Sequence, residues 1–340
     1  MGDLLFGLVS IVVGIAASYA LYWLLSFLLS LLPERVNRKA TWLAFLTPAA
    51  LLVILVLIVP LVQTAVWSFK DDSAKEWVGF QNYVDIFTDE KKTETGEVQV
   101  VFDERFMDIL LNNLLWVLFV PAVTVVVGTA AAALTNQVGP TREKIFKSLI
   151  FMPMSISFVA ASTIWAYFYS YVPPGRPEVG LLNAAMKGFG LDAQPWLTID
   201  QWRLNSFLLM IVIVWLQAGY AMVVISAAIK AVPEETIEAA QLDGANSWQT
   251  FIGVILPQVW GTVMSVFVTT LILVMKIFDI VLAMTRGNFT TSVLAFEWYK
   301  QFFENSNVGP ASAVVTILVL LIVPLMWIQI NTVRQQEALR

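Results

Sequence analysis

The chain has 340 residues, of which 58% are hydrophobic and only 13% are charged, and its formal net charge is −5. Soluble domains are about 45–50% apolar and about 25% charged, so this composition, with a mean hydropathy of +0.75, excludes a water-soluble globular protein. The chain has no cysteine and no histidine, which excludes thiol chemistry, thiolate or imidazole metal sites and His-based catalysis. Its basic residues form no block of the kind that binds nucleic acid.

Seven runs are long and apolar enough to cross a membrane as helices, because a hydrocarbon layer of ~30 Å needs about 20 residues. In chain order they are Leu4–Leu32, Leu43–Trp67, Ile109–Leu134, Ile145–Tyr169, Leu204–Ile229, Val259–Met284 and Ala311–Ile330. The first run lacks a basic start and a small-residue cleavage site, so we interpret it as a span and not as a signal peptide. In lipid, backbone groups must bond within their own segment. The sequence therefore predicts an all-α, polytopic membrane protein with about seven spans.

Short basic loops predict the orientation, because cytoplasmic loops carry an excess of Lys and Arg. The basic residues of the short loops and the tail are Arg35, Arg38, Lys39, Arg142, Lys144, Lys147, Arg334 and Arg340. All of them lie on one side if the N-terminus is outside and the C-terminus is cytoplasmic. Residues 231–258 are then cytoplasmic, and the stretches 70–108, 170–203 and 285–310 are external. A short strand pair is expected around Thr95-Gly96.

The cytoplasmic stretch has the signals of two consecutive short helices. Pro233 suits the first position of a helix, and the acidic Glu234–Glu235 follow in its first turn. Gly244 stands where that helix would end. A second short helix is expected to start near Asn246–Ser247 and to stop at Pro257. Small residues around the turn leave room for the backbone of another protein to approach.

These residues carry a family resemblance. Glu238-Ala239-Ala240, Asp243-Gly244-Ala245 and then Leu256-Pro257 stand at the spacing of the EAA loop of binding-protein-dependent ABC importers, although Val254 replaces a usual isoleucine. In that family the loop is the coupling helix that docks on the ATPase subunit. The resemblance implies coupling roles for Glu238, Ala239, Ala240, Asp243, Gly244, Ala245, Leu256 and Pro257. The alternative is an ordinary amphipathic linker.

Other segments indicate the kind of importer. Phe278-Asp279 resembles the residues that mark permeases of the type of the larger maltose-transporter permease. Thr285-Arg286-Gly287-Asn288-Phe289 resembles a segment of the alpha-glucoside and glucosylglycerol permeases. The resemblance implies a type I ABC importer permease fold. Residues 42–340 would form its six-helix core, and residues 1–41 an extra N-terminal transmembrane helix with a cytoplasmic linker. The expected function is uptake of sugars or glucosylated solutes of the alpha-glucoside or glucosylglycerol type.

A sugar site needs hydrogen-bond partners for hydroxyls and an aromatic face for the ring, and transporter sites lie near the midplane of the membrane. The polar and aromatic span residues that meet these conditions are Asn112, Asn113, Ser155, Ser157, Trp215, Gln217, Tyr220 and Asp279. The expected outer gate consists of Thr285, Gly287, Asn288 and Phe289. A binding protein could dock beyond it, at Glu297-Trp298-Tyr299.

Several of these residues have plainer interpretations. Asn113 could simply join two helices, and Trp215 could belong to the core. Lys276 and Asp279 stand three residues apart, so on one helix they could form an ion pair that lowers the cost of burying both charges. Gly219 would permit either a helix bend or close packing.

The chain has no Gly-x-x-x-x-Gly-Lys loop, so it is not expected to hydrolyse ATP. The resemblance implies that ATP and Mg²⁺ bind to partner subunits and that this chain, which is not an enzyme, binds no cofactor. The expected partners are a second permease subunit, two ATPase subunits, an extracytoplasmic solute-binding protein and the lipid bilayer of a bacterial inner membrane. The alternatives are a related ABC permease for another small solute, an ion-coupled secondary transporter and a polytopic membrane enzyme.

Overall fold

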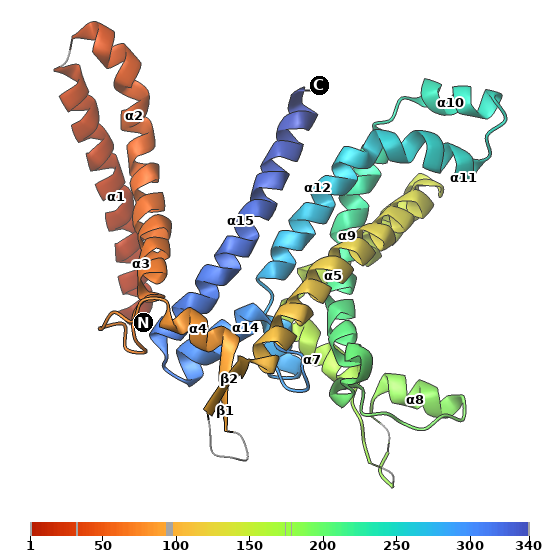
Figure 1. Ribbon diagram of the computed structural model, residues 1–340. Coiled ribbons are helices and arrows are strands. Elements are labelled where there is room, and N and C mark those ends of the chain that lie inside the picture. Colours follow the sequence, from red (N-terminus) through yellow and green to blue (C-terminus); the bar gives the residue numbers. More distant parts are fainter. Residues whose placement is uncertain (1, 32, 93–97, 174, 178, 339–340) are drawn as a thin grey trace. The chain divides into compact units, whose positions relative to one another are not determined.

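The computed structural model describes residues 2–31, 33–92, 98–173, 175–177 and 179–338 (Figure 1). It is mostly helical and divides into two compact units, Met1–Trp67 and Ser68–Arg340. Among the described residues, six helices are long and apolar enough to span a membrane, or seven if one bent pair forms a single span. The prediction of an all-α polytopic protein with about seven spans is confirmed.

The first unit is a helical hairpin. Helix α1 (Gly2–Ser30) packs against α2 (Glu34–Val53), with the rings of Tyr22 and Phe45 4.8 Å apart. Helix α2 continues through a π-turn, η1 (Ile54–Ile58), into α3 (Val59–Trp67). The wide turn precedes Pro60, whose ring would clash with a carbonyl of a regular helix. The segment predicted as a linker is helical from Glu34 onward.

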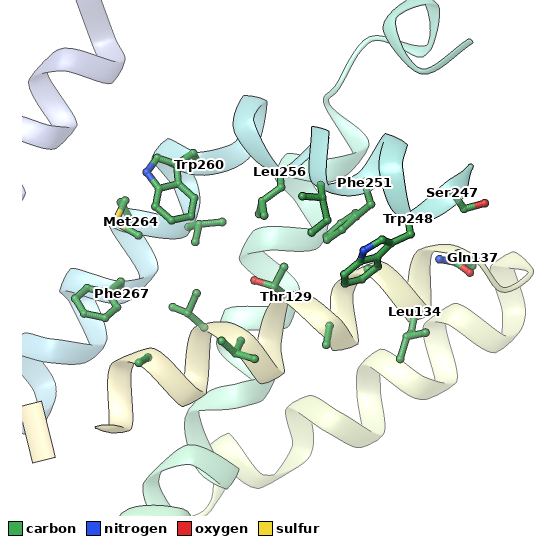
Figure 2. Close-up of a pocket in the computed structure, with 17 residues that line it drawn as sticks. Thr129, Leu134, Gln137, Ser247, Trp248, Phe251, Leu256, Trp260, Met264 and Phe267 are labelled. Carbon is green, nitrogen blue, oxygen red and sulfur yellow. The ribbon is translucent and has the colours of Figure 1, made fainter. Parts of the chain in front are cut away.

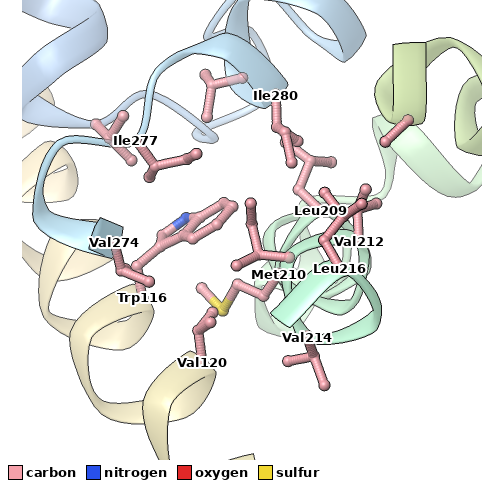
Figure 3. Packing of buried hydrophobic residues seen from close by; sticks show 14 of the residues in the cluster. Trp116, Val120, Leu209, Met210, Val212, Val214, Leu216, Val274, Ile277 and Ile280 are labelled. Carbon is pink, nitrogen blue, oxygen red and sulfur yellow. The ribbon is translucent and has the colours of Figure 1, made fainter. Parts of the chain in front are cut away.

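Four long helices organise the second unit: α5 (Glu104–Asn136), α9 (Leu204–Lys230), α12 (Leu256–Met275) and α15 (Val308–Ala338). Asp103 caps α5 by accepting hydrogen bonds from the backbone N–H groups of Arg105 and Phe106. Figure 3 shows the indole of Trp116, only 1% exposed, between α5, α9 and the residues that follow α12. This core fixes the positions of the helices that surround the candidate site.

The predicted fourth span is not a continuous helix. Helix α6 (Pro140–Phe151) passes through the 3₁₀ turn η2 (Met152–Ser155) and bends by 101° into α7 (Phe158–Phe168). Pro153 lacks an N–H group, and the extended residue Ile156 ends the turn. Ser157 then starts α7 by accepting a hydrogen bond from the N–H of Ala160. The span predicted over Ile145–Tyr169 is therefore a bent pair of helices and not one continuous helix.

The predicted sixth span is also divided. Helix α12 ends at Met275, and the short helix α13 (Asp279–Met284) begins after Phe278, whose φ is −142°. Lys276 and Asp279 thus lie on opposite sides of a helix break, and no ion pair joins them within the described part of the chain. The predicted pairing on one helix was wrong, because the spacing argument holds only within a continuous helix.

The two predicted short helices of the cytoplasmic stretch are α10 (Glu234–Leu242) and α11 (Ser247–Thr250). The second does not stop at Pro257. It runs through the π-turn η5 (Phe251–Ile255) into α12, so that Ser247–Met275 forms one span. The wide turn before Pro257 accommodates the proline ring, as the turn before Pro60 does.

The remaining elements of the second unit lie mainly at the end of the bundle opposite α10 (Figure 1). Strands β1 (Thr88–Lys92) and β2 (Val98–Phe102) pair antiparallel with Thr88 opposite Phe102, which confirms the predicted strand pair. The predicted turn at Thr95-Gly96 lies outside the described residues. The helical elements here are α4 (Gln81–Phe87), α8 (Leu181–Gly188), η3 (Trp196–Thr198), η4 (Gln201–Arg203), α14 (Leu294–Tyr299) and η6 (Lys300–Glu304).

Candidate functional site

A cavity of about 510 Å³ lies where the bent span meets α9 and the break between α12 and α13. We call it the Gln217 pocket. Its lining residues are Met154, Ile156, Ser157, Phe158, Val159, Leu216, Gln217, Leu273 and Asp279. Three of the eight predicted path residues, Ser157, Gln217 and Asp279, therefore come together from three separate elements.

The polar groups of this pocket have unused hydrogen-bonding capacity. Gln217 is 7% exposed and Asp279 is half-buried, and neither the amide nor the carboxylate makes a side-chain hydrogen bond to any described residue. Burying a polar group without a partner is costly, so such groups mark a place where a ligand or water binds. Phe158 adds an aromatic ring to the same wall. An amide and a carboxylate can bind sugar hydroxyls, and an aromatic face can cover the apolar side of the ring.

The other predicted path residues are engaged elsewhere. Ser155 donates its hydroxyl to the carbonyl of Met152 at 2.7 Å. Trp215 packs edge to face on Trp165, with ring centroids 5.8 Å apart, which favours the plainer core interpretation. Tyr220 packs against a second hydrophobic cluster. None of these residues is among the described residues that line the Gln217 pocket.

Asn112 and Asn113 hold the segment that follows the predicted gate. The amide of Asn112 donates to the carbonyl of Ser292 at 2.9 Å, and the Asn113 side-chain oxygen accepts from the N–H of Leu294 at 2.7 Å. A third asparagine, Asn205, lies on α9, and its side-chain amide donates to the carbonyl of Phe289 at 2.7 Å. Sequence reasoning missed Asn205, although a polar residue at the start of an apolar span is a usable signal.

The predicted gate residues form a tight turn with several left-handed backbone conformations. Arg286, Gly287 and Phe289 all have positive φ values, and a Cβ on Gly287 would lie 2.4 Å from the ring of Phe296. Glycine is therefore required at this position. The hydroxyls of Thr285 and Thr291 lie 2.6 Å apart and close the base of the turn.

Glu297 does not form part of an accessible docking surface. It is 3% exposed, its carboxylate pairs with Arg105 at 2.5 Å, and it accepts a hydrogen bond from Gln301 at 2.8 Å. The pair joins the start of α5 to α14. A second ion pair, between Asp108 and Arg203, joins α5 to the start of α9. These contacts hold the elements around the gate turn together.

A turn centred on Asp71 shapes the segment before α4. Hydrogen bonds from the Ser73 hydroxyl and from the backbone N–H groups of Glu76 and Lys75 lower the pKa of Asp71 to about 2. A depressed pKa means that this contribution to folding is present above the ordinary pKa near 3.8 and is lost as the pH falls toward 2. The Asp71 carboxyl group is therefore ionised at neutral pH, where it accepts the hydrogen bonds of the turn.

At the opposite end of the bundle, the turn between α10 and α11 has the geometry predicted for it. Gly244 has a φ of +87°, its N–H donates to Gln241 O at 3.0 Å, and the N–H of Ala245 donates to Ala240 O at 3.0 Å. These two bonds form a Schellman motif, which needs a left-handed residue at this point. Asn246 then starts α11 through a capping box with Gln249.

The α10–α11 hairpin exposes its own surface. Among the predicted coupling residues, Glu238, Ala239, Asp243, Gly244 and Pro257 are exposed, and Ala240, Ala245 and Leu256 are half-buried. Leu242 is 89% exposed and Trp248 is 71% exposed. Leu242 lies outside the spans and Trp248 lies at the start of the span Ser247–Met275. Large apolar side chains exposed at such a turn indicate a protein interaction surface.

A larger groove of about 800 Å³ lies between α5 and the α11–α12 helix (Figure 2). Its lining is almost wholly apolar and includes Leu134, Phe251, Trp260, Met264 and Phe267. Such a surface offers hardly any hydrogen-bond partners to sugar hydroxyls, whose burial without partners is costly. The smaller Gln217 pocket is therefore the better candidate for a substrate site.

Gly219 serves close packing. An added Cβ would lie 2.5 Å from the carbonyl oxygen of Ile150 and 2.6 Å from the Cα of Phe151. Only glycine lets α9 approach the end of α6 to this distance. The alternative of a bend is not needed, because α9 continues to Lys230 as one helix.

Two curated relatives cover nearly the whole chain. The alpha-glucoside transport system permease protein AglF of Rhizobium meliloti (strain 1021) is 38% identical over 98% of this chain and 99% of the relative. The osmoprotective compounds uptake permease protein GgtC of Synechocystis sp. (strain ATCC 27184 / PCC 6803 / Kazusa) is 41% identical over 87% of this chain and 100% of the relative.

The fold matches a solved structure of a bacterial ABC transporter involved in the import of the acidic polysaccharide alginate. The TM-score is 0.71 at 22% identity, over 88% of this chain and 98% of that chain. A related structure, in complex with an alginate pentasaccharide-bound periplasmic protein, gives a TM-score of 0.70 at 21% identity, over 89% of this chain and 96% of that chain. Residues 124–334 match the family described as binding-protein-dependent transport system inner membrane component. The chain is therefore a multi-pass inner-membrane permease of the binding-protein-dependent ABC importer family.

Proposed function

We propose that this permease forms the path for an alpha-glucoside or a glucosylated osmolyte and that the solute contacts Gln217 and Asp279. The observation that carries the proposal is the pair of unpartnered polar side chains in the Gln217 pocket. The amide and the carboxylate would bind hydroxyl groups, and Phe158 would cover an apolar face of the ring. The two relatives, named for alpha-glucosides and for osmoprotective compounds, support this solute class.

The arrangement of helices supports a mechanism of alternating access. Helix α9 enters the α10–α11 hairpin and α12 leaves it, and both helices also line the Gln217 pocket through Leu216, Gln217 and Leu273. Movement of the hairpin would therefore displace two walls of the pocket. Binding partners bias such a transition only if they prefer one of the two states.

The partners belong to the same proposal. The exposed hairpin would dock on one of two ATPase subunits, which would bind ATP and Mg²⁺, and a second permease would complete the path. An extracytoplasmic binding protein would deliver the solute at the end that carries the gate turn. This assignment places the hairpin and the C-terminus in the cytoplasm and the N-terminus outside, as the basic loops indicate.

The test is ATP-dependent uptake by the full transporter in proteoliposomes, with labelled alpha-glucosides and glucosylglycerol as probes. Gln217→Ala and Asp279→Asn should each lower uptake about tenfold or more, since a hydrogen bond to a buried partner contributes about 1–3 kcal/mol. Ser155→Ala is the matched control, because its hydroxyl bonds to Met152 and lies outside the pocket lining. Normal uptake by both pocket variants would refute the assignment.

A further inference from the structure

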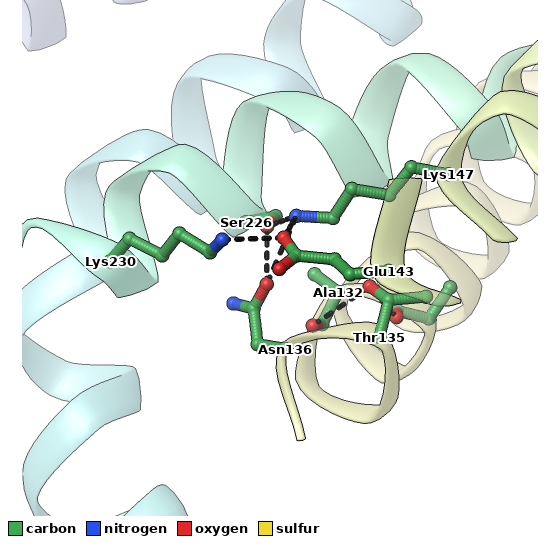
Figure 4. Close-up of polar contacts among 8 residues, drawn as sticks. Ala132, Thr135, Asn136, Glu143, Lys147, Ser226 and Lys230 are labelled. Carbon is green, nitrogen blue, oxygen red and sulfur yellow. Dashed lines mark hydrogen bonds and ion pairs between the residues drawn. The ribbon is translucent and has the colours of Figure 1, made fainter. Parts of the chain in front are cut away.

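A polar network joins three helices at the end of the bundle that carries the α10–α11 hairpin (Figure 4). Glu143 on α6 accepts hydrogen bonds from Lys147 on the same helix and from Lys230 on α9, each at 2.5 Å. Lys147 also donates to Asn136 at the end of α5, at 3.0 Å, and contacts Ser226 on α9. Ser226 donates to the same Asn136 oxygen at 2.7 Å. We call these five residues the Glu143 network.

This network differs from an ordinary surface ion pair. The side chains of Glu143 and Lys147 are only 15% and 21% exposed, and Lys230 is 52% exposed. A single carboxylate neutralises two ammonium groups that lie close together. Removing that carboxylate would leave two like charges side by side, one of them largely buried, which is destabilising. Glu143 is therefore the residue on which the contact between α6 and Lys230 depends.

The position of the network relates it to transport. Lys230 is the last residue of α9, and α10 begins at Glu234. At the other end of the same contact, Gly219 of α9 packs directly on Ile150 and Phe151 of α6. The two helices are thus joined at two levels, and α6 leads through Met152–Ser155 into the wall of the Gln217 pocket.

We propose that Glu143 is a positioning residue that makes α6 move together with the base of the α10–α11 hairpin. Through this contact, displacement of the hairpin reaches the pocket wall at residues 154–159 as well as the wall on α9. The inference rests on the proposed function, because it assigns a route for the motion that drives transport. Coupled movement of α6 and the hairpin requires a physical contact through which the two elements shift as one body.

The test measures solute taken up per ATP hydrolysed by the full transporter with its solute-loaded binding protein. Glu143→Gln and Lys230→Gln should retain stimulated ATP hydrolysis but lower uptake per ATP about fivefold or more, the low end of typical coupling between sites. Lys144→Gln is the matched control, because Lys144 is exposed on the same helix and belongs to no contact of the network. A merely structural role would reduce uptake and hydrolysis together through loss of assembled protein.

A covalent tie provides an independent test. The chain has no cysteine, so Glu143→Cys combined with Lys230→Cys creates one reactive pair. The unlinked double variant should show low uptake per ATP, and linking the two thiols with a flexible bis-maleimide should restore it toward the wild-type ratio. The single Glu143→Cys variant with the same reagent is the control and should stay low.

The outcomes separate the two proposals. A wild-type uptake ratio in Glu143→Gln, or failure of the link to restore the ratio in an assembled double variant, would overturn the role of Glu143 and leave the proposed function intact. If the wild-type transporter shows no ATP hydrolysis stimulated by a glucoside-loaded binding protein, the proposed function itself fails and this role fails with it.

Discussion

Gly244 shows how one residue can be required for two separate reasons. Its φ of +87° lies in the left-handed region, yet an added Cβ would meet no atom of the described residues within 4 Å, its two chain neighbours aside. Contacts inside this chain therefore require glycine for its left-handed backbone conformation and not because a side chain would clash. A docked ATPase subunit would add a steric requirement at the same position.

Substitutions at Gly244 can separate these reasons. Asparagine adopts left-handed conformations more readily than other residues with a Cβ, so Gly244→Asn should keep the Schellman turn while adding bulk. We expect it to reduce ATP-driven uptake more than tenfold, as Gly244→Asp and Glu238→Lys should, with the protein still folded in detergent. The measurements are uptake and co-purification of the ATPase subunit.

Gly139→Asn is the matched control for that experiment. Gly139 also has open space around it, and it precedes α6 as its N-cap, where asparagine is favoured. Uptake by Gly139→Asn should stay close to the wild-type value. Full uptake by Gly244→Asn and Glu238→Lys would argue decisively against docking of the hairpin.

At the scale of elements, α5 holds the segment that follows the predicted gate through two neighbouring asparagines with unequal roles. Asn113 satisfies the buried N–H of Leu294, whereas the side-chain oxygen of Asn112 has no hydrogen-bond partner among the described residues. Removing Asn113 leaves a buried donor unpaired. Removing Asn112 loses one bond but also removes an unpaired buried oxygen.

Asn113→Ala should therefore destabilise the protein by about 1–3 kcal/mol, and Asn112→Ala by less. Thermal unfolding of the purified protein in mild detergent, followed by near-ultraviolet circular dichroism, measures the difference between the two variants. Val117→Ala, a partly buried change on the same helix, controls for loss of apolar contact alone. Equal shifts in the two asparagine variants would contradict the unequal roles.

At the scale of the whole molecule, the chain contains the Gln217 pocket and the α10–α11 hairpin, and its sequence has no Gly-x-x-x-x-Gly-Lys loop. Purified alone and reconstituted in liposomes, it should neither hydrolyse ATP nor accumulate glucosides. Addition of the ATPase subunit and the second permease should restore both activities when the loaded binding protein is present. Accumulation by this chain alone under an ion gradient would instead establish a secondary transporter.

Most of the fold and part of the site could be predicted from the sequence, because their signals are local. The length of each apolar run predicts a span, and the order Pro233, Glu234, Gly244 predicts the helix and turn of the hairpin within one residue. The capping box at Asn246 is likewise set by residues three positions apart. These features depend on residues that are close to one another in the chain, so they can be recognised in the sequence itself.

The grouping of the site residues was decided only by tertiary structure. Ser157, Gln217 and Asp279 meet because the fourth span bends by 101° and the sixth divides after Met275, and neither break has an unambiguous local signal. The contact between Glu143 and Lys230 joins residues that are 87 positions apart. Such contacts depend on how whole helices pack, so composition and spacing identify the polar residues but do not determine which of them face one another.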